Sequence, residues 1–188
     1  MKITSAVFVK GVMGDDAILE DGIPQIAFIG RSNAGKSSLI NSLTGKSKLA
    51  ISSNTPGRTR ELNVFRINKT HYFIDLPGYG YAKVGGKAIE KLNKLIVWYL
   101  LESKHTPRVV LLIDAEVGPT ADDLATLKEL ERTGKDILVV ANKVDKIKKS
   151  HYLNHMKKLQ EKIRGHKLFP FSSKTKVGIE ELRDELFS

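Results

Sequence analysis

The stretch that decides the fold is GRSNAGKS, from Gly30 to Ser37. It matches the pattern G-x-x-x-x-G-K-[ST] in full, and it lies between the apolar run QIAFIG (25–30) and an amphipathic segment that begins at Lys36. Its glycines let the backbone curl so that successive amides point at phosphate oxygens, and the following helix adds its positive end. Lys36 would meet the outer phosphates, and the Ser37 hydroxyl can bind Mg²⁺. The stretch therefore predicts a phosphate-binding loop between a strand and a helix.

Around this loop, apolar runs of strand length alternate with segments of helical period, which is typical of an α/β domain with a mainly parallel sheet. The expected strands are 25–30, 61–67, 71–76, 108–114, 136–142 and 167–171. Asn68-Lys69 suits a tight hairpin, so one strand is expected to be antiparallel. The expected helices are 36–43, 88–102, 121–133, 150–163 with Ser150 as N-cap, and 178–187. The sequence predicts one domain over 1–188, a three-layer sandwich whose six-stranded sheet carries helices on both faces.

Composition narrows the class of protein. The chain has 188 residues, of which 41% are hydrophobic, and no apolar run approaches the roughly 20 residues of a membrane span. It has no cysteine, which excludes disulfides and thiolate metal sites, and its first residues lack the pattern of a signal peptide. We therefore expect a soluble, cytoplasmic protein. The formal net charge of +10 favours polyanionic partners, nucleic acid first, although a lysine-rich surface also serves solubility alone.

A second motif, Asn142-Lys143-Val144-Asp145, stands at the end of the expected strand 136–142, on the edge where open parallel sheets bind ligands. A carboxylate at Asp145 can accept two hydrogen bonds from the ring N–H and the exocyclic amine of guanine, and adenine offers no such donor pair. Asn142 would tie this segment to the phosphate loop, and the stem of Lys143 would lie on the base. Phe171, Ser172 and Ser173 follow the last strand and would close over the base.

A third motif, DLPGYGY, runs from Asp75 to Tyr81 after the apolar run HYFI. An Asp-x-x-Gly at this place would hold the metal and sense the terminal phosphate, and a glutamine usually follows to orient the attacking water. Here Tyr79 follows instead. The order of the motifs, with a threonine-bearing loop between the first two strands, predicts a guanine nucleotide switch.

The longer strings GRSNAGKSSLIN from Gly30, SNTPGRTRELN from Ser53 and DLPGYGYA from Asp75 resemble the EngB (YihA/YsxC) family of bacterial ribosome-assembly GTPases. The likeness covers almost the whole chain. It implies a Ras-like P-loop NTPase fold, GTP and GDP binding with Mg²⁺, a role in assembly of the large (50S) ribosomal subunit, and a link to cell division and septation. Glu116 and Val117 depart from the family pattern, since many members carry Arg and His there.

The resemblance also implies roles for single residues. The Mg²⁺ ligands would be Ser37, Thr59 and, through water, Asp75, and the catalytic groups would be Lys36, Thr59, Gly78 and Asn33. The nucleotide contacts would be Gly30, Arg31, Ser32, Asn33, Ala34, Gly35, Lys36, Ser37, Ser38, Gly57, Arg58, Thr59, Arg60, Glu61, Asp75, Leu76, Pro77, Gly78, Asn142, Lys143, Val144, Asp145, Phe171, Ser172 and Ser173.

We expect a monomeric GTP-dependent switch with slow hydrolysis that presents a basic surface to ribosomal RNA. The candidate contacts are Lys83, Lys87, Lys91 and Lys94, unless these lysines form a solvated helix face. A constitutive RNA-binding protein that uses GTP only to hold its fold is the alternative. The base-reading Asp145 argues against a nucleoside kinase. Asn33 either supports a K⁺ ion near the bridging phosphate oxygens or hydrogen-bonds its own loop.

Overall fold

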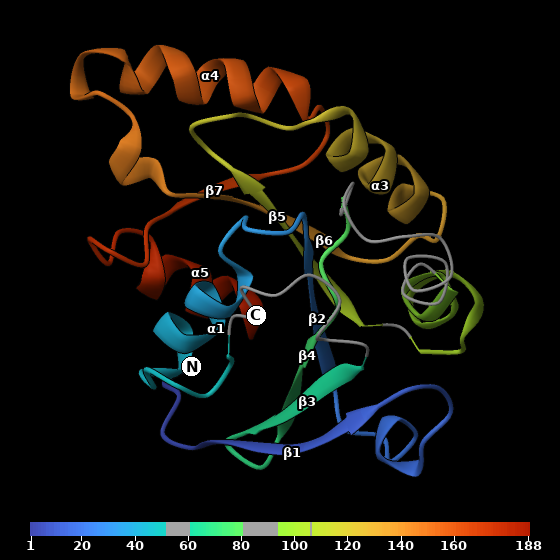
Figure 1. The fold of residues 1–188 in the computed structure, drawn as a ribbon. Helices are drawn as coiled ribbons and strands as arrows, with labels where there is room; N and C mark the ends of the chain where they lie inside the picture. Colours follow the sequence, from blue (N-terminus) through green and yellow to red (C-terminus); the bar gives the residue numbers. More distant parts are fainter. Residues whose placement is uncertain (52–60, 81–93, 106) are drawn as a thin grey trace.

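The computed structural model describes residues 1–51, 61–80, 94–105 and 107–188, and in these it contains a seven-stranded sheet (Figure 1). The strand order is β1-β3-β4-β2-β5-β6-β7. β3 runs antiparallel to both of its neighbours, and every other adjacent pair is parallel. The strands are β1 (Ala6–Val12), β2 (Gln25–Gly30), β3 (Leu62–Ile67), β4 (His71–Asp75), β5 (Arg108–Asp114), β6 (Ile137–Asn142) and β7 (Leu168–Phe171).

All six expected strands are present with ends shifted by no more than one residue, but the expected number of six is wrong because β1 adds a seventh. β1 lies at the edge of the sheet, and only Ala6 and Val12 at its two ends are buried. The exposed Val7, Phe8 and Val9 interrupt any alternation of apolar and polar residues, and the pairing register with β3 shifts between Phe8 and Lys10. A strand with this bulge has no period of two for a sequence pattern to detect.

The hairpin between β3 and β4 is confirmed. Asn68 and Lys69 both have positive φ, 48° and 62°, and the Thr70 amide donates to the Ile67 carbonyl oxygen at 3.0 Å. Two successive residues with positive φ are the feature of a type I′ hairpin turn. Asparagine adopts this conformation more readily than most residues because its short polar side chain bonds locally. The turn therefore fixes the antiparallel direction of β3.

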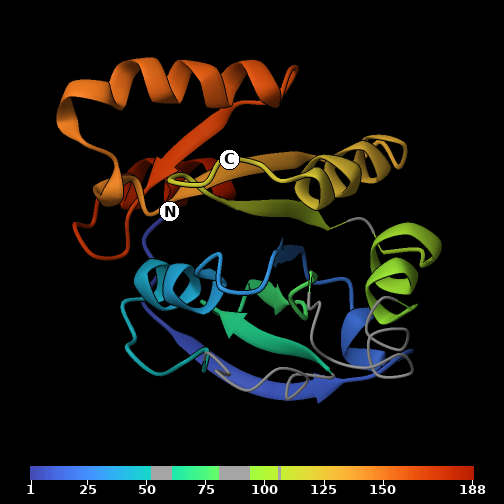
Figure 2. The same cartoon turned by 45° about the horizontal axis from the view of Figure 1, so that its top comes forward.

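Helices cover both faces of the sheet, which makes the three layers that Figures 1 and 2 show from two directions. α1 (Lys36–Thr44) and α5 (Ile179–Leu186) bury Leu39, Leu43 and Leu182 against one face. The other face carries α3 (Ala121–Glu131), α4 (Tyr152–Lys162) and a helical segment over 94–102 that ends in the π-helix η2 (Trp98–Glu102). Short 3₁₀ turns are η1 (Ala17–Leu19), η3 (Val144–Lys146) and η4 (Lys149–His151). The expected helix 88–102 is therefore seen only from residue 94, since 88–93 lie outside the described residues.

The start of α4 differs from the expectation. Ser150 is not its N-cap, because Lys149 to His151 form the 3₁₀ turn η4 and the helix begins at Tyr152. His151 occupies the cap position in a helical conformation and accepts no capping hydrogen bond through its side chain. Across the described parts of the chain, no helix has the length and apolar character needed to cross a membrane.

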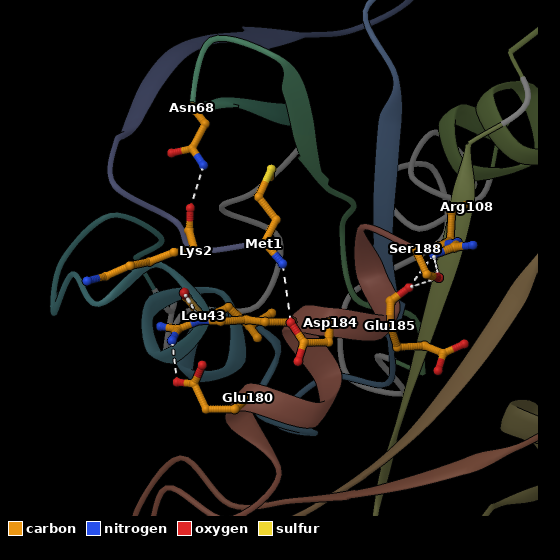
Figure 3. A network of polar contacts seen from close by, with 10 residues as sticks. Met1, Lys2, Leu43, Asn68, Arg108, Glu180, Asp184, Glu185 and Ser188 are labelled. Carbon is orange, nitrogen blue, oxygen red and sulfur yellow. Dashed lines mark hydrogen bonds and ion pairs between the residues drawn. The ribbon is translucent and has the colours of Figure 1, made fainter.

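The two chain ends meet at the amino-terminal ends of the parallel strands, as Figure 3 shows. The Met1 amino group lies 3.2 Å from the Asp184 carboxylate, and the Asn68 amide donates to the Lys2 carbonyl oxygen at 2.8 Å. Arg108, the first residue of β5, donates to the Glu185 carbonyl oxygen. A cavity of about 560 Å³ lies at this end, lined among others by Gln25, His71, Arg108, Lys135 and Phe187. It is at the opposite end of β2 from the Gly30 loop, so it is not the predicted nucleotide site.

Candidate functional site

The phosphate loop connects the last residue of β2, Gly30, to the first residue of α1, Lys36. Asn33 and Gly35 turn the backbone with φ of 66° and 96°, and the Ala34 amide donates to the Arg31 carbonyl oxygen at 3.0 Å. A Cβ atom at position 35 would overlap the side-chain amide nitrogen of Asn142. Glycine is therefore required here both by the backbone conformation and by the close approach of a second loop.

The phosphate loop meets the Asp-x-x-Gly segment because β2 and β4 are adjacent parallel strands, with Phe28 paired to Asp75. The Lys36 ammonium donates to the Asp75 carboxylate, and the two side chains are only 13% and 6% exposed. Ser37 follows Lys36 at the start of α1. Hydroxyl and carboxylate oxygens are the ligands that Mg²⁺ prefers, so the donor set of Ser37 and Asp75 fits that ion. The described residues hold no group of three or more His, Cys, Asp or Glu side chains placed for a metal. A Mg²⁺ ion bound here would therefore take further oxygens from its nucleotide and from water.

The backbone after Asp75 runs against the phosphate loop. The Ser32 amide donates to the Tyr79 carbonyl oxygen at 2.9 Å, and the Tyr79 amide donates to the Gly30 carbonyl oxygen at 3.3 Å. A Cβ atom at position 78 would lie 3.2 Å from the Ser32 amide nitrogen, which is tighter than ordinary van der Waals contact. Gly78 therefore permits the close approach, and its Asp-x-x-Gly segment lies beside the phosphate loop as the motif order predicted.

The side chain of Tyr79 contacts α3. Its hydroxyl donates to the Asp123 carboxylate at 2.6 Å, and burial together with this hydrogen bond raises the pKa of the Tyr79 hydroxyl far above its ordinary value. The second carboxylate oxygen of Asp123 accepts from the Thr120 amide at 2.8 Å, and the Asp123 amide donates back to the Thr120 hydroxyl. Sequence reasoning missed Asp123, although Thr120-x-x-Asp123 before an apolar helix is a capping-box signal.

The Asn142 segment is held to the phosphate loop by two side chains. The Asn142 amide donates to the Ala34 carbonyl oxygen at 2.8 Å, which is the tie that the sequence predicted. The Lys143 ammonium lies 2.7 Å from the Asn33 carbonyl oxygen and 2.6 Å from the Asp114 carboxylate. Lys143 therefore also bridges the loop to the end of β5.

Asp114 is the second residue that sequence reasoning missed, although it ends the apolar run of β5 as Asp75 ends that of β4. The Asp114 side chain is 10% exposed, and burial by itself raises the pKa of its carboxyl. The hydrogen bond and charge of Lys143, together with hydrogen bonds from the Glu116 and Val117 amides, outweigh that effect, so the pKa of Asp114 lies below its ordinary value. Asp114 therefore stays ionised and holds Lys143 against the phosphate loop.

Asp145 meets the last of the predicted loops because β6 and β7 are paired with Asn142 opposite Phe171. The buried Ser172 hydroxyl donates to the Asp145 carboxylate at 2.6 Å and accepts from the Thr175 amide at 3.1 Å. The serine side chain thus orients the carboxylate that the sequence assigns to base recognition. Closure of this loop over the base stays a prediction.

The remaining predicted residues divide into two groups. Glu61 is exposed just before β3, Asn33 is exposed in the phosphate loop, and Lys94 lies in the helical segment before η2. Gly57, Arg58, Thr59, Arg60, Lys83, Lys87 and Lys91 lie outside the described residues. At the two positions where the sequence departs from the expected pattern, Glu116 forms an ion pair with Lys146 at 3.0 Å and Val117 is 60% exposed.

Comparison with known proteins agrees with this geometry. Residues 25–143 match the model of a family described as 50S ribosome-binding GTPase. The chain is 44% identical to the probable GTP-binding protein EngB of Clostridium perfringens strain 13 over 100% of its own length and 96% of that protein. It is 40% identical to the probable GTP-binding protein EngB of Acholeplasma laidlawii, over 100% and 99% of the two chains.

Two solved structures also resemble it at 26% identity. One is the crystal structure of a probable GTP-binding protein EngB, with a TM-score of 0.67 over 87% of this chain and 96% of that one. The other is Era in complex with MgGDPNP and nucleotides 1506–1542 of 16S ribosomal RNA, with a TM-score of 0.69 over 87% of this chain and 55% of Era. The fold is thus the expected one of P-loop GTPases. On these likenesses the chain belongs to the EngB family of GTP-binding proteins.

Proposed function

We propose that this protein is a GTP-dependent switch in assembly of the large ribosomal subunit. In this proposal it acts as a cytoplasmic monomer, and one domain over residues 1–188 performs the role. Normal cell division depends on it. One observation carries the proposal. Three loops from the ends of β2, β6 and β7 are joined by hydrogen bonds from Asn142 to Ala34, from Lys143 to Asn33 and from Ser172 to Asp145. Such a joined set suits a single ligand that has phosphates at one end and guanine at the other.

The ribosomal part of the proposal is supported by the description of the matched family as 50S ribosome-binding and by the net charge of +10. Era, which this chain matches over 55% of Era's length, forms a complex with nucleotides of 16S ribosomal RNA, and this likeness supports ribosomal RNA as a class of partner. A cationic protein binds polyanions in part through release of counterions, so ribosomal RNA is a chemically suitable partner.

In the nucleotide complex, the amides of 30–38 hold the phosphates, Lys36 leaves Asp75 for the outer phosphates, and Asp145 reads guanine. Ser37, Thr59 and Asp75, the last through water, hold Mg²⁺. When bound, this ion neutralises charge on the phosphates. Gly57 to Glu61 and the Gly78 amide meet the terminal phosphate, so that hydrolysis releases both segments.

Hydrolysis is slow without a partner, because Tyr79 stands where a glutamine usually orients water and its hydroxyl is bonded to Asp123. Lys36, Thr59 and Gly78 would stabilise charge on the transferred group, and Asn33 would help to hold a K⁺ ion that supplies positive charge as an arginine finger does in other GTPases. The test compares the rate of single-turnover GTP hydrolysis in K⁺ and in Na⁺ at equal ionic strength. We expect faster hydrolysis in K⁺, and loss of that difference in Asn33→Ala.

The switch itself is tested by binding to large-subunit particles at fixed salt, with the protein loaded either with a non-hydrolysable GTP analogue or with GDP. Tighter binding with the analogue is expected. Equal affinity in the two states would remove the switch. If, in addition, no hydrolysis occurred with particles and K⁺, the constitutive RNA-binding alternative would replace it.

A further inference from the structure

Positive charge is concentrated in one segment of the chain. Residues 146–167 contain eight Lys and Arg residues and one acidic residue, Glu161, so they carry seven of the ten net positive charges. This segment runs from η3 through η4 and α4 to the start of β7. We call its eight cations the α4 cationic surface: Lys146, Lys148, Lys149, Lys157, Lys158, Lys162, Arg164 and Lys167.

All eight of these side chains are exposed. Lys146 pairs with Glu116 at 3.0 Å, and Lys167 pairs with Glu185 at 3.0 Å. Within the described ranges, the other six cations make no ion pair and no side-chain hydrogen bond. Their charges are therefore not neutralised by the protein itself.

Helix stability does not account for the charge at the start of α4, although Lys162 in its last turn suits the helix dipole. α4 has no acidic residue in its first turn and no side-chain N-cap, and Lys148, Lys149 and His151 precede it directly. Cations at this end oppose the helix dipole, and neighbouring like charges repel each other. Among them lies Leu153, which is 83% exposed although it is apolar. A segment that breaks local stability rules on its exposed side points to function there.

The position of α4 leaves this side open. α4 packs on the sheet through Leu159 and Ile163, and in both ribbon views it lies at the outer limit of the molecule beyond β7, at the far side from β1 (Figures 1 and 2). It follows the Asn142–Asp145 segment in the chain. α3 lies between it and the helical segment that contains Lys94, and α3 carries Asp122, Glu129 and Glu131. Among the described residues, the α4 cationic surface is thus separate from Lys94, the fourth of the lysines that the sequence proposed for RNA contact.

We propose that the α4 cationic surface is a docking site for the phosphate backbone of structured RNA, an inference that rests on the proposed ribosomal function. Charge complementarity selects this occupant, because exposed cations that are not neutralised by the protein contact phosphates without reading bases. The 11 residues of α4 extend about 16 Å at about 1.5 Å per residue. One strand of a duplex places on the order of four or five phosphates along that length.

The test compares two triple variants of the full chain loaded with a non-hydrolysable GTP analogue. Lys149→Gln, Lys157→Gln and Lys158→Gln remove three charges from the surface. Lys2→Gln, Lys46→Gln and Lys48→Gln remove three exposed charges elsewhere. Affinity for large ribosomal subunits and for a double-stranded RNA oligonucleotide is measured between 50 and 200 mM salt. In the α4 variant, the slope of log affinity against log salt is expected to fall by about one unit per contacting lysine, and affinity at 0.1 M salt by about tenfold or more.

The control triple should bind like the wild type, and Arg in place of Lys at 149, 157 and 158 should retain the salt slope. GDP affinity should stay unchanged in all of these variants, and the unfolding temperature of the Lys149, Lys157 and Lys158 glutamine variant should not fall, since Lys149 opposes the helix dipole. A second triple variant, with Gln in place of Lys148, Lys162 and Arg164, removes three other charges from the same surface. If both triples lose RNA affinity, misfolding of one variant does not explain the loss. If the α4 variants bound subunits in the GTP state with wild-type affinity and slope, this inference would fail while the proposed function stood. If the wild type bound neither probe, both would fail. Loss of binding to anionic lipid vesicles with RNA binding intact would assign the surface to a membrane and overturn the inference.

Discussion

At the scale of single residues, Tyr79 occupies the position after Asp-x-x-Gly, and its environment decides what it can do. Its hydroxyl donates to Asp123, and burial keeps it protonated because its pKa lies far above the ordinary value. A neutral phenol bonded in this way is a poor general base. We infer that Tyr79 anchors the end of the Asp75–Gly78 segment to α3. The group that orients the attacking water is then a different one.

Replacing Tyr79 by Phe tests this anchoring role. The variant leaves one oxygen of the buried Asp123 without its donor, so we expect a loss of about 1–3 kcal/mol in the free energy of unfolding. GTP hydrolysis should continue. The measurements are denaturant unfolding and single-turnover hydrolysis. The matched control is Tyr99→Phe, which removes a 2.7 Å hydrogen bond to Gln25 on another part of the same face. Hydrolysis lost at unchanged stability would make the Tyr79 hydroxyl catalytic.

Ser172 is a second residue whose side chain has a definite role in the structure. Ser172→Ala removes the 2.6 Å hydrogen bond that orients Asp145. A hydrogen bond to a charged group contributes about 1.5–3 kcal/mol, so we expect GDP affinity to fall by roughly tenfold to a hundredfold. Calorimetric titration with GDP measures this affinity. Ser150→Ala is the control, because Ser150 is exposed outside the nucleotide loops and its hydroxyl makes no hydrogen bond within the described residues. Equal GDP affinity in both variants would separate Ser172 from base binding.

At the scale of elements, the site depends on turns that follow the strand ends. Gly178 connects the loop after β7 to α5 with φ of 78°, and a Cβ atom there would overlap the Pro170 carbonyl oxygen. This contact sets where α5 begins relative to β7, and β7 in turn carries Ser172 to Asp145. The turn at Gly178 therefore helps to determine the position of Ser172.

Comparing Gly178→Ala with Gly165→Ala separates the stability cost of steric overlap from the cost of a left-handed backbone conformation. Gly165 has a similar φ of 87°, but nothing lies within 4 Å of a Cβ atom at that position. We expect Gly165→Ala to cost about 1 kcal/mol from the left-handed backbone alone, and Gly178→Ala to cost more than about 2 kcal/mol. Urea unfolding of the two variants gives the comparison. Equal losses would show that the Pro170 contact relaxes freely.

At the scale of the whole molecule, the candidate nucleotide site is assembled from the ends of four adjacent strands, from β2 at the centre of the sheet to β7 at its edge. Asn33 and Ala34 come from the β2 end, Asp114 from β5, Asn142 from β6 and Ser172 from β7. A ligand that contacts these loops together binds the folded state and not the unfolded chain. Nucleotide binding must therefore stabilise the entire fold.

GDP with Mg²⁺ at a free concentration of 100 times its dissociation constant should raise the free energy of unfolding by about 2.7 kcal/mol. The unfolding temperature is measured with GDP, with ADP at the same concentration, and with GDP after chelation of the metal. ADP should have little effect, since adenine lacks the donor pair that Asp145 accepts. Chelation should reduce the GDP effect. An equal increase with ADP would contradict guanine recognition by this site.

The strands 25–30, 71–76 and 108–114, the phosphate loop and the Asn142–Asp145 segment were predictable because each depends on local patterns, namely apolar runs and spaced glycine, lysine and aspartate residues. Only the tertiary structure decided that β1 is a seventh strand, that Tyr79 bonds to Asp123 and that Ser172 orients Asp145. These partners are 44 and 27 residues apart in the chain, and they meet because parallel strand order places distant strand ends at one edge. A local pattern contains the residues of a contact, whereas the pairing of strands determines which residues meet.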